Sequence, residues 1–237
     1  MKMDLNDLIN YIRKKSILSE ITEDAAIENP HAVFNYGVTE VSFSDEDFFK
    51  IKTDFSNEDQ LRDAYNIINV NICRDFFNVI ISHIPEYNQN HNAGKKSVSI
   101  DLGTTREPLN VTKNNILDLL CDINTILDEV EVSFNLHTKR YVILPPNLCA
   151  MIHKKMIAAN GQVAKNISIS GLVGEFNGLT LFISNNLPRF NCPSKYYVIL
   201  GGVYNSILYN IKKQGDVIKI KFYIDKPQDL AMARVSQ

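Results

Sequence analysis

The stretch GLVGEFNGLTLFISNNLP, Gly171–Pro188, is the most informative about the fold of this 237-residue chain. Asn177–Gly178 is a type I′ turn signal, because both residue types tolerate the positive φ that this turn requires. The apolar runs on either side therefore predict a β-hairpin with strands over 172–176 and 179–184. The glycine spacing misses the dinucleotide pattern G-x-G-x-x-G, and a hairpin offers no helix N-terminus to a phosphate.

Upstream of this hairpin, the sequence predicts a helix, a strand and a second helix. RYVIL (140–144) is typical of a buried strand, and Pro145–Pro146 starts a helix over NLCAMIHKKMIAA (147–159). Thr112 can cap an earlier amphipathic helix over 114–130. Its apolar stripe consists of Ile116, Leu119, Leu120, Ile123, Ile126 and Leu127, and its solvated face carries Asp118, Asp122, Asp128, Glu129 and Glu131.

The N-terminal part predicts an arm, a β excursion and a long helix. Residues 4–18 form a short amphipathic helix with Leu5, Leu8, Ile9 and Ile12 on one face, followed by an acidic polar stretch to Pro30. An extended hairpin over 31–55 follows, and it buries too little to be stable alone. A helix then runs from Ser56 to Pro85. Its expected apolar positions are Leu61, Ala64, Ile67, Ile68, Ile72, Phe76, Val79, Ile80 and His83.

The remaining segments read mostly as strands. We expect strands over 97–102 and 195–202, a short connecting segment, and a final hairpin around Gln214–Asp216. DVIKIKFYID (216–225) alternates with a period of two, which predicts a strand with Lys219 and Lys221 on its open face. Helices and strands do not form a run of βαβ units, so the predicted fold class is α+β.

Charge is distributed unevenly along the chain. The 25 basic and 27 acidic side chains nearly cancel. Residues 1–138, however, hold 12 basic and 23 acidic side chains, whereas residues 139–237 hold 13 and 4. This balance excludes a uniformly basic nucleic-acid binder and favours contacts between copies. The N-terminus lacks a signal-peptide cleavage site and no apolar run reaches the roughly 20 residues of a membrane span, so we expect a soluble protein without membrane partners.

No pattern of residues predicts catalysis. Cys73, Cys121, Cys149 and Cys192 form no CxxC pair, and the five histidines form no HxH or HxxxH pair. No nucleophile elbow, P-loop or zinc-protease motif occurs. Asp45–Asp47 are adjacent residues of an extended segment and point to alternate sides, which makes a poor cage for a cation. We therefore predict no catalytic residue, no metal and no cofactor.

The segment from Asn114 to Pro188, about 75 residues, resembles the tailed-bacteriophage major capsid proteins of the Hong Kong 97-type fold. In that family a helix ending in Leu-Asp-Glu precedes an Arg-Tyr-hydrophobic-Pro-Pro strand and helix. A Gly-x-x-Gly-x-hydrophobic-x-Gly hairpin and a Ser-Asn-Asn-Leu-Pro-like segment follow. The matching residues here are Leu127–Glu129, Arg140–Pro146, Gly171–Gly178 and Ser184–Pro188.

The resemblance implies a layout for the whole chain. It makes residues 1–30 an N-terminal arm and 31–55 an extended loop that overlaps a neighbouring subunit. Residues 56–103 and 216–237 become a peripheral domain with a spine helix, and 104–215 an axial domain. The extended loop supplies the predicted inter-subunit contacts, which are Asp45, Glu46, Asp47, Phe48, Phe49, Lys50 and Lys52.

The resemblance also implies a function. Identical subunits would form pentamers and hexamers of an icosahedral virion shell around double-stranded DNA, assembled in the host cytoplasm. A portal protein and separate scaffold or cement proteins would be partners. Because the chain is short for the family and has no long N-terminal scaffolding segment, a separate scaffold, or a compact relative of the family, is implied. Three alternatives stay open: a phage auxiliary or cement protein, an encapsulin-type nanocompartment shell, and a soluble α+β enzyme with a site among the acids of 112–131 or the loop 86–96.

Overall fold

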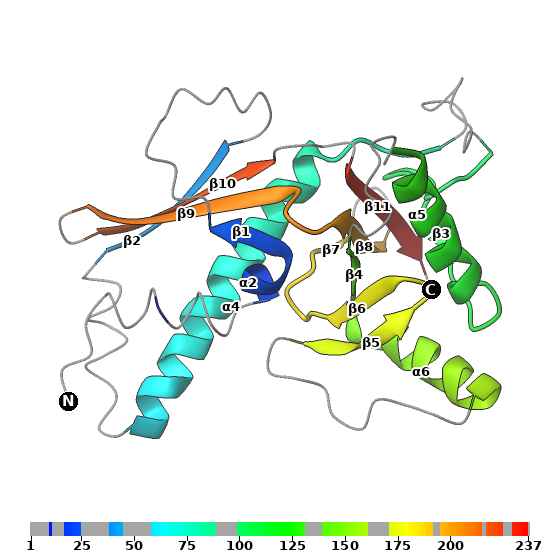
Figure 1. The fold of residues 1–237 in the computed structure, drawn as a ribbon, viewed down its shortest axis with the longest axis horizontal. Coiled ribbons are helices and arrows are strands. Elements are labelled where there is room, and N and C mark those ends of the chain that lie inside the picture. The colour runs from blue at the N-terminus through cyan, green and yellow to red at the C-terminus, as the bar shows by residue number, and fades with distance from the viewer. Residues whose placement is uncertain are drawn as a thin grey trace.

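The computed structural model describes residues 10, 17–24, 38–44, 58–88, 99–130, 139–160, 171–191, 195–214, 217–224 and 229–236. Within these ranges the chain forms two β-sheets, three long helices and one short helix (Figure 1). The long helices are α4 (Glu58–His83), α5 (Ile116–Val130) and α6 (Pro146–Asn160). The mixed α+β class predicted from the sequence is therefore confirmed.

The larger sheet has seven strands, most of them antiparallel. Along it lie β3 (Leu109–Asn110), β11 (Leu230–Ser236), β8 (Tyr196–Val203), β4 (Arg140–Leu144), β6 (Leu179–Ile183) and β5 (Leu172–Phe176), and β7 (Arg189–Phe190) also pairs with β8. Only β4 with β6 and β3 with β11 run parallel. Strands distant in the sequence thus meet in one sheet, with β5 at its edge.

The smaller sheet has four strands in the order β1, β9, β10, β2. They are β1 (Thr22–Asp24), β9 (Ile207–Gln214), β10 (Val217–Ile224) and β2 (Val38–Ser44). β9 and β10 form a hairpin, and β2 pairs antiparallel with β10 along its whole length. Residues 38–44 of the predicted extended hairpin therefore pair with a strand of the same chain.

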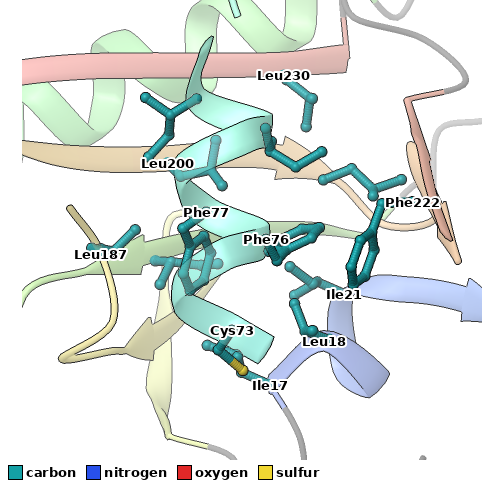
Figure 2. Packing of buried hydrophobic residues seen from close by; sticks show 14 of the residues in the cluster. Ile17, Leu18, Ile21, Cys73, Phe76, Phe77, Leu187, Leu200, Phe222 and Leu230 are labelled. Atoms are coloured by element: carbon teal, nitrogen blue, oxygen red, sulfur yellow. The ribbon is translucent and has the colours of Figure 1, made fainter. Parts of the chain in front are cut away.

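Helix α4 packs against both sheets. Its buried side chains share one hydrophobic cluster with Phe222 of the smaller sheet, Leu200 of the larger sheet, and Ile17, Leu18 and Ile21 of the short helix α2 (Ile17–Ile21). Figure 2 shows Phe76 directed toward Phe222, with Phe77 on the side of the helix nearer Leu187. The Phe76 and Phe222 ring centroids lie 4.6 Å apart. At 1.5 Å per residue, the 26 residues of α4 span about 39 Å.

The seven-stranded sheet is buried on both faces. Successive side chains of a strand point to opposite faces, so Tyr141 and Ile143 of β4 face α4, whereas Val142 and Leu144 join the cluster around α5 and α6. The side chains of β11 alternate between the two faces in the same way, and Met232 belongs to the cluster around α4. The subunit thus has α4 on one face of this sheet and α5 with α6 on the other.

Several sequence predictions are confirmed by these elements. All six residues of the predicted α5 stripe are buried, and α6 begins at Pro146 as expected. Asn177 and Gly178 have φ values of 47° and 80°, the positive pair that a type I′ turn requires. The long helix, the strand over 140–144 and the final alternating strand are also present.

The strand predicted over 97–102 is wrong for its described part, residues 99–102, which are turn and irregular structure. Gly103 has a φ of 78°, and its N–H donates to the Asp101 carboxylate at 2.7 Å. This turn interrupts the hydrogen-bond ladder that a strand over these residues would form. Only Leu102 makes strand-like bonds, donating to the Tyr87 carbonyl at 2.9 Å and accepting from the Arg234 N–H at 2.8 Å.

The predicted apolar stripe of α4 is also partly wrong. Ile67 is 50% exposed, and His83 is exposed as well. Ile67 lies about 100° around the helix from the buried Ile68, on a side of α4 that is left exposed. Cys73, Phe77, Ile81 and Ile84, which the stripe omitted, are buried because α4 is covered from more than one side.

One further segment differs from expectation. The stretch expected to be polar and irregular contains β1, which pairs parallel with β9. The short segment before the final hairpin contains the eight-residue strand β9, which pairs antiparallel with β10 as the predicted hairpin requires. Most of the predicted N-terminal helix lies outside the described residues. The division into arm, peripheral and axial domains stays a prediction, and β11 belongs to the same sheet as β8 and β4.

Candidate functional site

The contact residues predicted from the sequence, Asp45–Lys50 and Lys52, lie outside the described part of the chain, so their role stays a prediction. The structure does show the residue that precedes them. β2 ends at Ser44, which pairs with Val217 at the beginning of β10. The predicted contact residues therefore follow directly from the outer strand of the smaller sheet.

Ile67 and Val70 are exposed apolar residues of α4, and Val70 lines a groove of about 260 Å³. The groove is lined by Asn66, Asn69, Val70 and Cys73 of α4, by Ile17 of α2, and by Gly171 with residues 183–186. Val70 is 43% exposed, and Leu172, which follows Gly171, is 39% exposed. These three side chains are the large hydrophobic residues that the described structure leaves exposed. Sequence reasoning missed this surface, because the predicted apolar stripe of α4 placed Ile67 on the buried face.

A buried ion pair joins the end of α4 to β11. The Arg234 Nε lies 3.6 Å from Glu86 Oε1, and the Arg234 side chain is only 8% exposed. The same carboxylate oxygen accepts from the Thr105 N–H at 2.7 Å and from its hydroxyl at 2.6 Å. Arg234 Nη1 is buried without a hydrogen-bond partner. The negative charge of Glu86 therefore balances the positive charge of Arg234, whose side chain is almost completely buried.

A second polar cluster fixes α5 against the hairpin of β5 and β6. Arg140 forms an ion pair with Asp128 and donates to the Asn124 side chain at 2.9 Å. Asn124 in turn donates to the Asn177 carbonyl at 3.1 Å. Asp128 and Asn124 are therefore occupied in holding the Asn177–Gly178 turn and β4 to one helix.

The thiols of Cys121 and Cys149 are not activated for nucleophilic chemistry. Burial raises the pKa of Cys121, and Asp118 and Asp122 raise it further. Burial also raises the pKa of Cys149, whose Sγ lies 4.0 Å from Nε2 of His153. Catalytic cysteines instead have depressed pKa values that favour the thiolate. These environments suit structural thiols.

Asp122 is one of the acids of 112–131 that the enzyme alternative involves. Burial, followed by the charge of Asp118, raises the pKa of Asp122. Among the described residues, no group of three or more His, Cys, Asp or Glu side chains is placed to hold a metal ion. None of the described helices has the length and apolar content needed to cross a bilayer.

Comparison with known proteins gives structural likenesses only. No family model matches the sequence, and no curated protein matches it. Solved structures that the fold resembles include phage capsids and a virus-like particle. One is from Mycobacterium phage Che8, with 11% identity, a TM-score of 0.47, and coverage of 83% of this chain and 70% of that one.

Two others are similar at comparable identity. The satellite phage P4 procapsid structure that includes the size determination protein matches at 12% identity and a TM-score of 0.42, covering 100% of this chain and 92% of that one. A virus-like particle from Pyrococcus furiosus matches at 10% identity and a TM-score of 0.39, covering 84% and 75%. At such identities, residue roles in this chain have to be argued from its own residues.

Proposed function

We propose that this protein is the major capsid protein of a tailed bacteriophage, many copies of which assemble into the icosahedral head that encloses the DNA genome. The observation that carries the proposal is the course of the chain from α5 to Pro188. The motifs behind the sequence resemblance lie at the end of α5, in β4 and the start of α6, in the hairpin of β5 and β6, and in the segment after β6. They follow in the order that the resemblance implies.

Assembly in this proposal proceeds through many weak contacts between identical subunits in pentamers and hexamers. Helix α4 would be the rigid spine of each subunit, since its buried face is held by both sheets. The residues Asp45–Lys52 would reach a neighbouring subunit, with Asp45, Glu46 and Asp47 meeting basic groups of the back half. Portal, cement and scaffold proteins and non-specifically bound double-stranded DNA complete the set of partners in the virion.

The chemistry of the described residues favours a structural role over catalysis. The polar clusters around Arg140 and Arg234 tie elements of one subunit together. The thiols of Cys121 and Cys149 have raised pKa values, the opposite of what a nucleophile needs. The enzyme alternative thus gains no support from these two thiols.

Electron microscopy of the purified, overexpressed protein tests the proposal. We expect closed shells or ring-shaped capsomers, and shells that protect DNA from nuclease when formed in phage-infected cells. A strictly monomeric protein at tens of micromolar, over a range of salt concentrations, would contradict the proposal. Shells that enclose a protein cargo and no DNA would favour the nanocompartment alternative.

Substitution of the predicted contact residues tests the proposed mechanism. Neutralising Asp45, Glu46 and Asp47 together as Asn, Gln and Asn should reduce the shell yield and flatten its salt dependence, because opposite charges would no longer steer assembly. Asp63→Asn is the matched control, since it removes one exposed acid from α4. Deleting the whole excursion 31–55 is a poorer test, because β2 is a strand of the smaller sheet.

A further inference from the structure

A short turn between β8 and β9 joins the two sheets. β8 belongs to the larger sheet and β9 to the smaller one, so the chain passes from one sheet to the other over residues 204–206. Asn205 in this turn has a φ of 65°, which its short polar side chain tolerates. The Tyr204 N–H donates to the carbonyl of Lys139, the residue before β4, at 3.0 Å. This bond fixes one side of the turn to the larger sheet.

The other side of the turn is held by an N-terminal strap, which we define as α2 and β1, residues 17–24. The Asn205 N–H donates to the Ile21 carbonyl at 3.3 Å. β1 then extends the smaller sheet by pairing with β9, while α2 packs against α4 (Figure 1). The buried strap residues in the α4 cluster are Ile17, Leu18 and Ile21. The strap thus contacts α4, the smaller sheet and the junction between the sheets at the same time.

The strap is held less firmly than the elements it covers. α2 has five residues, far fewer than the roughly 12 that an isolated helix needs in water. β1 has three residues at the edge of its sheet, whereas β10 is paired on both sides, with β9 and with β2. The groove of about 260 Å³ borders Ile17, so one side of α2 lacks close packing. Loss of the strap therefore leaves β9, β10 and β2 paired with one another.

We propose that the N-terminal strap is a releasable lock on the junction between the two sheets. Docked, it holds the turn and keeps the sheets at the angle that the structure shows. Detached, it takes three aliphatic side chains out of the α4 cluster and frees the Asn205 N–H. Residues 204–206 then act as a hinge, and the smaller sheet shifts relative to the larger one as the packed side chains of α4 slide. This inference goes beyond the proposed function and does not depend on shell formation.

Hydrogen exchange of the wild-type protein, followed by mass spectrometry, tests whether the strap opens locally. After correction for intrinsic rates, we expect the amides of residues 17–24 and 204–209 to exchange together, more than about tenfold faster than those of β4 and β8. The amides of β10 should behave like those of β4 and β8, because β10 keeps both of its neighbours. Strap amides protected as strongly as those of β4 and β8 would overturn the proposal.

A distance measurement tests the hinge. Spin labels are attached to unnatural amino acids at Thr125, which is exposed on α5, and at Gln214, the last residue of β9. Double electron–electron resonance then gives the distribution of distances between the two labels. Ile21→Ser removes a fully buried strap side chain and should broaden or shift this distribution. Glu20→Ser, at an exposed position of the same short helix, is the matched control and should give the wild-type distribution.

A second label pair separates a hinge from a general loosening of the fold. Labels at Thr125 and Ala150, exposed on the two helices that cover one face of the larger sheet, should keep their distance in every folded variant. Ile17→Ser, a milder change beside the groove, replaces Ile21→Ser should that variant fail to fold. A folded strap variant with the wild-type distribution between positions 125 and 214, or with changes in both label pairs, would overturn the lock. Neither result bears on whether the protein forms shells.

Discussion

The two faces of the seven-stranded sheet are covered in different ways. One face packs against α5 and α6, with Ile123 of α5 lying over Gly201. The other face packs against α4, which also contacts the smaller sheet and α2. A helix that covers one sheet has a single buried stripe, so the stripe of α5 was predicted in full. A helix held from several sides has no single stripe, and the prediction for α4 was wrong at Ile67.

The largest expected effect comes from the α4 face. Phe76→Ala removes a fully buried ring that packs on Phe222 and Phe77, with centroids 4.6 Å and 5.2 Å away. We expect it to lower the free energy of unfolding by about 3–5 kcal/mol, measured by urea denaturation. Asn78→Ala, exposed on the same helix, should change it by less than about 0.5 kcal/mol. Equal losses for both variants would mean that α4 is not held between the sheets.

Substituting the two partners of the ion pair between Glu86 and Arg234 should lower the stability by unequal amounts. Glu86→Gln leaves the Arg234 cation buried and uncompensated, so we expect a loss of about 2–3 kcal/mol in unfolding free energy. Arg234→Met removes the buried charge and leaves Glu86, which is 29% exposed, in reach of water, so its cost should be about 1 kcal/mol. A larger loss for Arg234→Met than for Glu86→Gln would contradict this assignment.

On the sheet face that packs against α5, added side-chain volume should lower the stability. A Cβ at Gly201 would lie 2.5 Å from Cγ2 of Ile123, so Gly201→Ala forces the helix and the sheet apart. We expect a loss of about 1–3 kcal/mol. The double variant with Ile123→Ala should lose less than the sum of the two single variants, because the second substitution removes the colliding methyl group. Additive losses in the urea-denaturation cycle would show that Gly201 is not limited by α5.

The smallest effect at neutral pH concerns Tyr141 on the α4 face. Tyr141→Phe should change the unfolding free energy by less than about 1 kcal/mol at pH 7, since only the hydroxyl is lost. Burial raises the pKa of Tyr141 above its ordinary value. The folded state therefore keeps this proton while the unfolded chain loses it, and the stability present below about pH 10 falls as the pH rises further. Unfolding measurements from pH 9 to pH 11 should show a shallower fall for Tyr141→Phe, and parallel curves would contradict the assignment.

Local sequence patterns determined much of this fold. The type I′ turn at Asn177–Gly178 follows from residues that tolerate positive φ, and the helix after Pro145–Pro146 from the fixed φ of proline. The order of these elements also carried the resemblance to phage capsid proteins. Such features depend on a few neighbouring residues, so the sequence alone could specify them.

Other features depended on segments far apart in the chain. β1 had no strong signal, because its partner strand β9 lies far along the chain and stabilises it more than its own residues do. The pairing of Glu86 with Arg234 spans most of the chain, and the exposure of Ile67 depends on which sides of α4 the rest of the chain covers. The sequence by itself determined the elements and their order. The tertiary structure decided which faces are buried and which apolar surface stays exposed, because burial depends on what the rest of the chain places against each element.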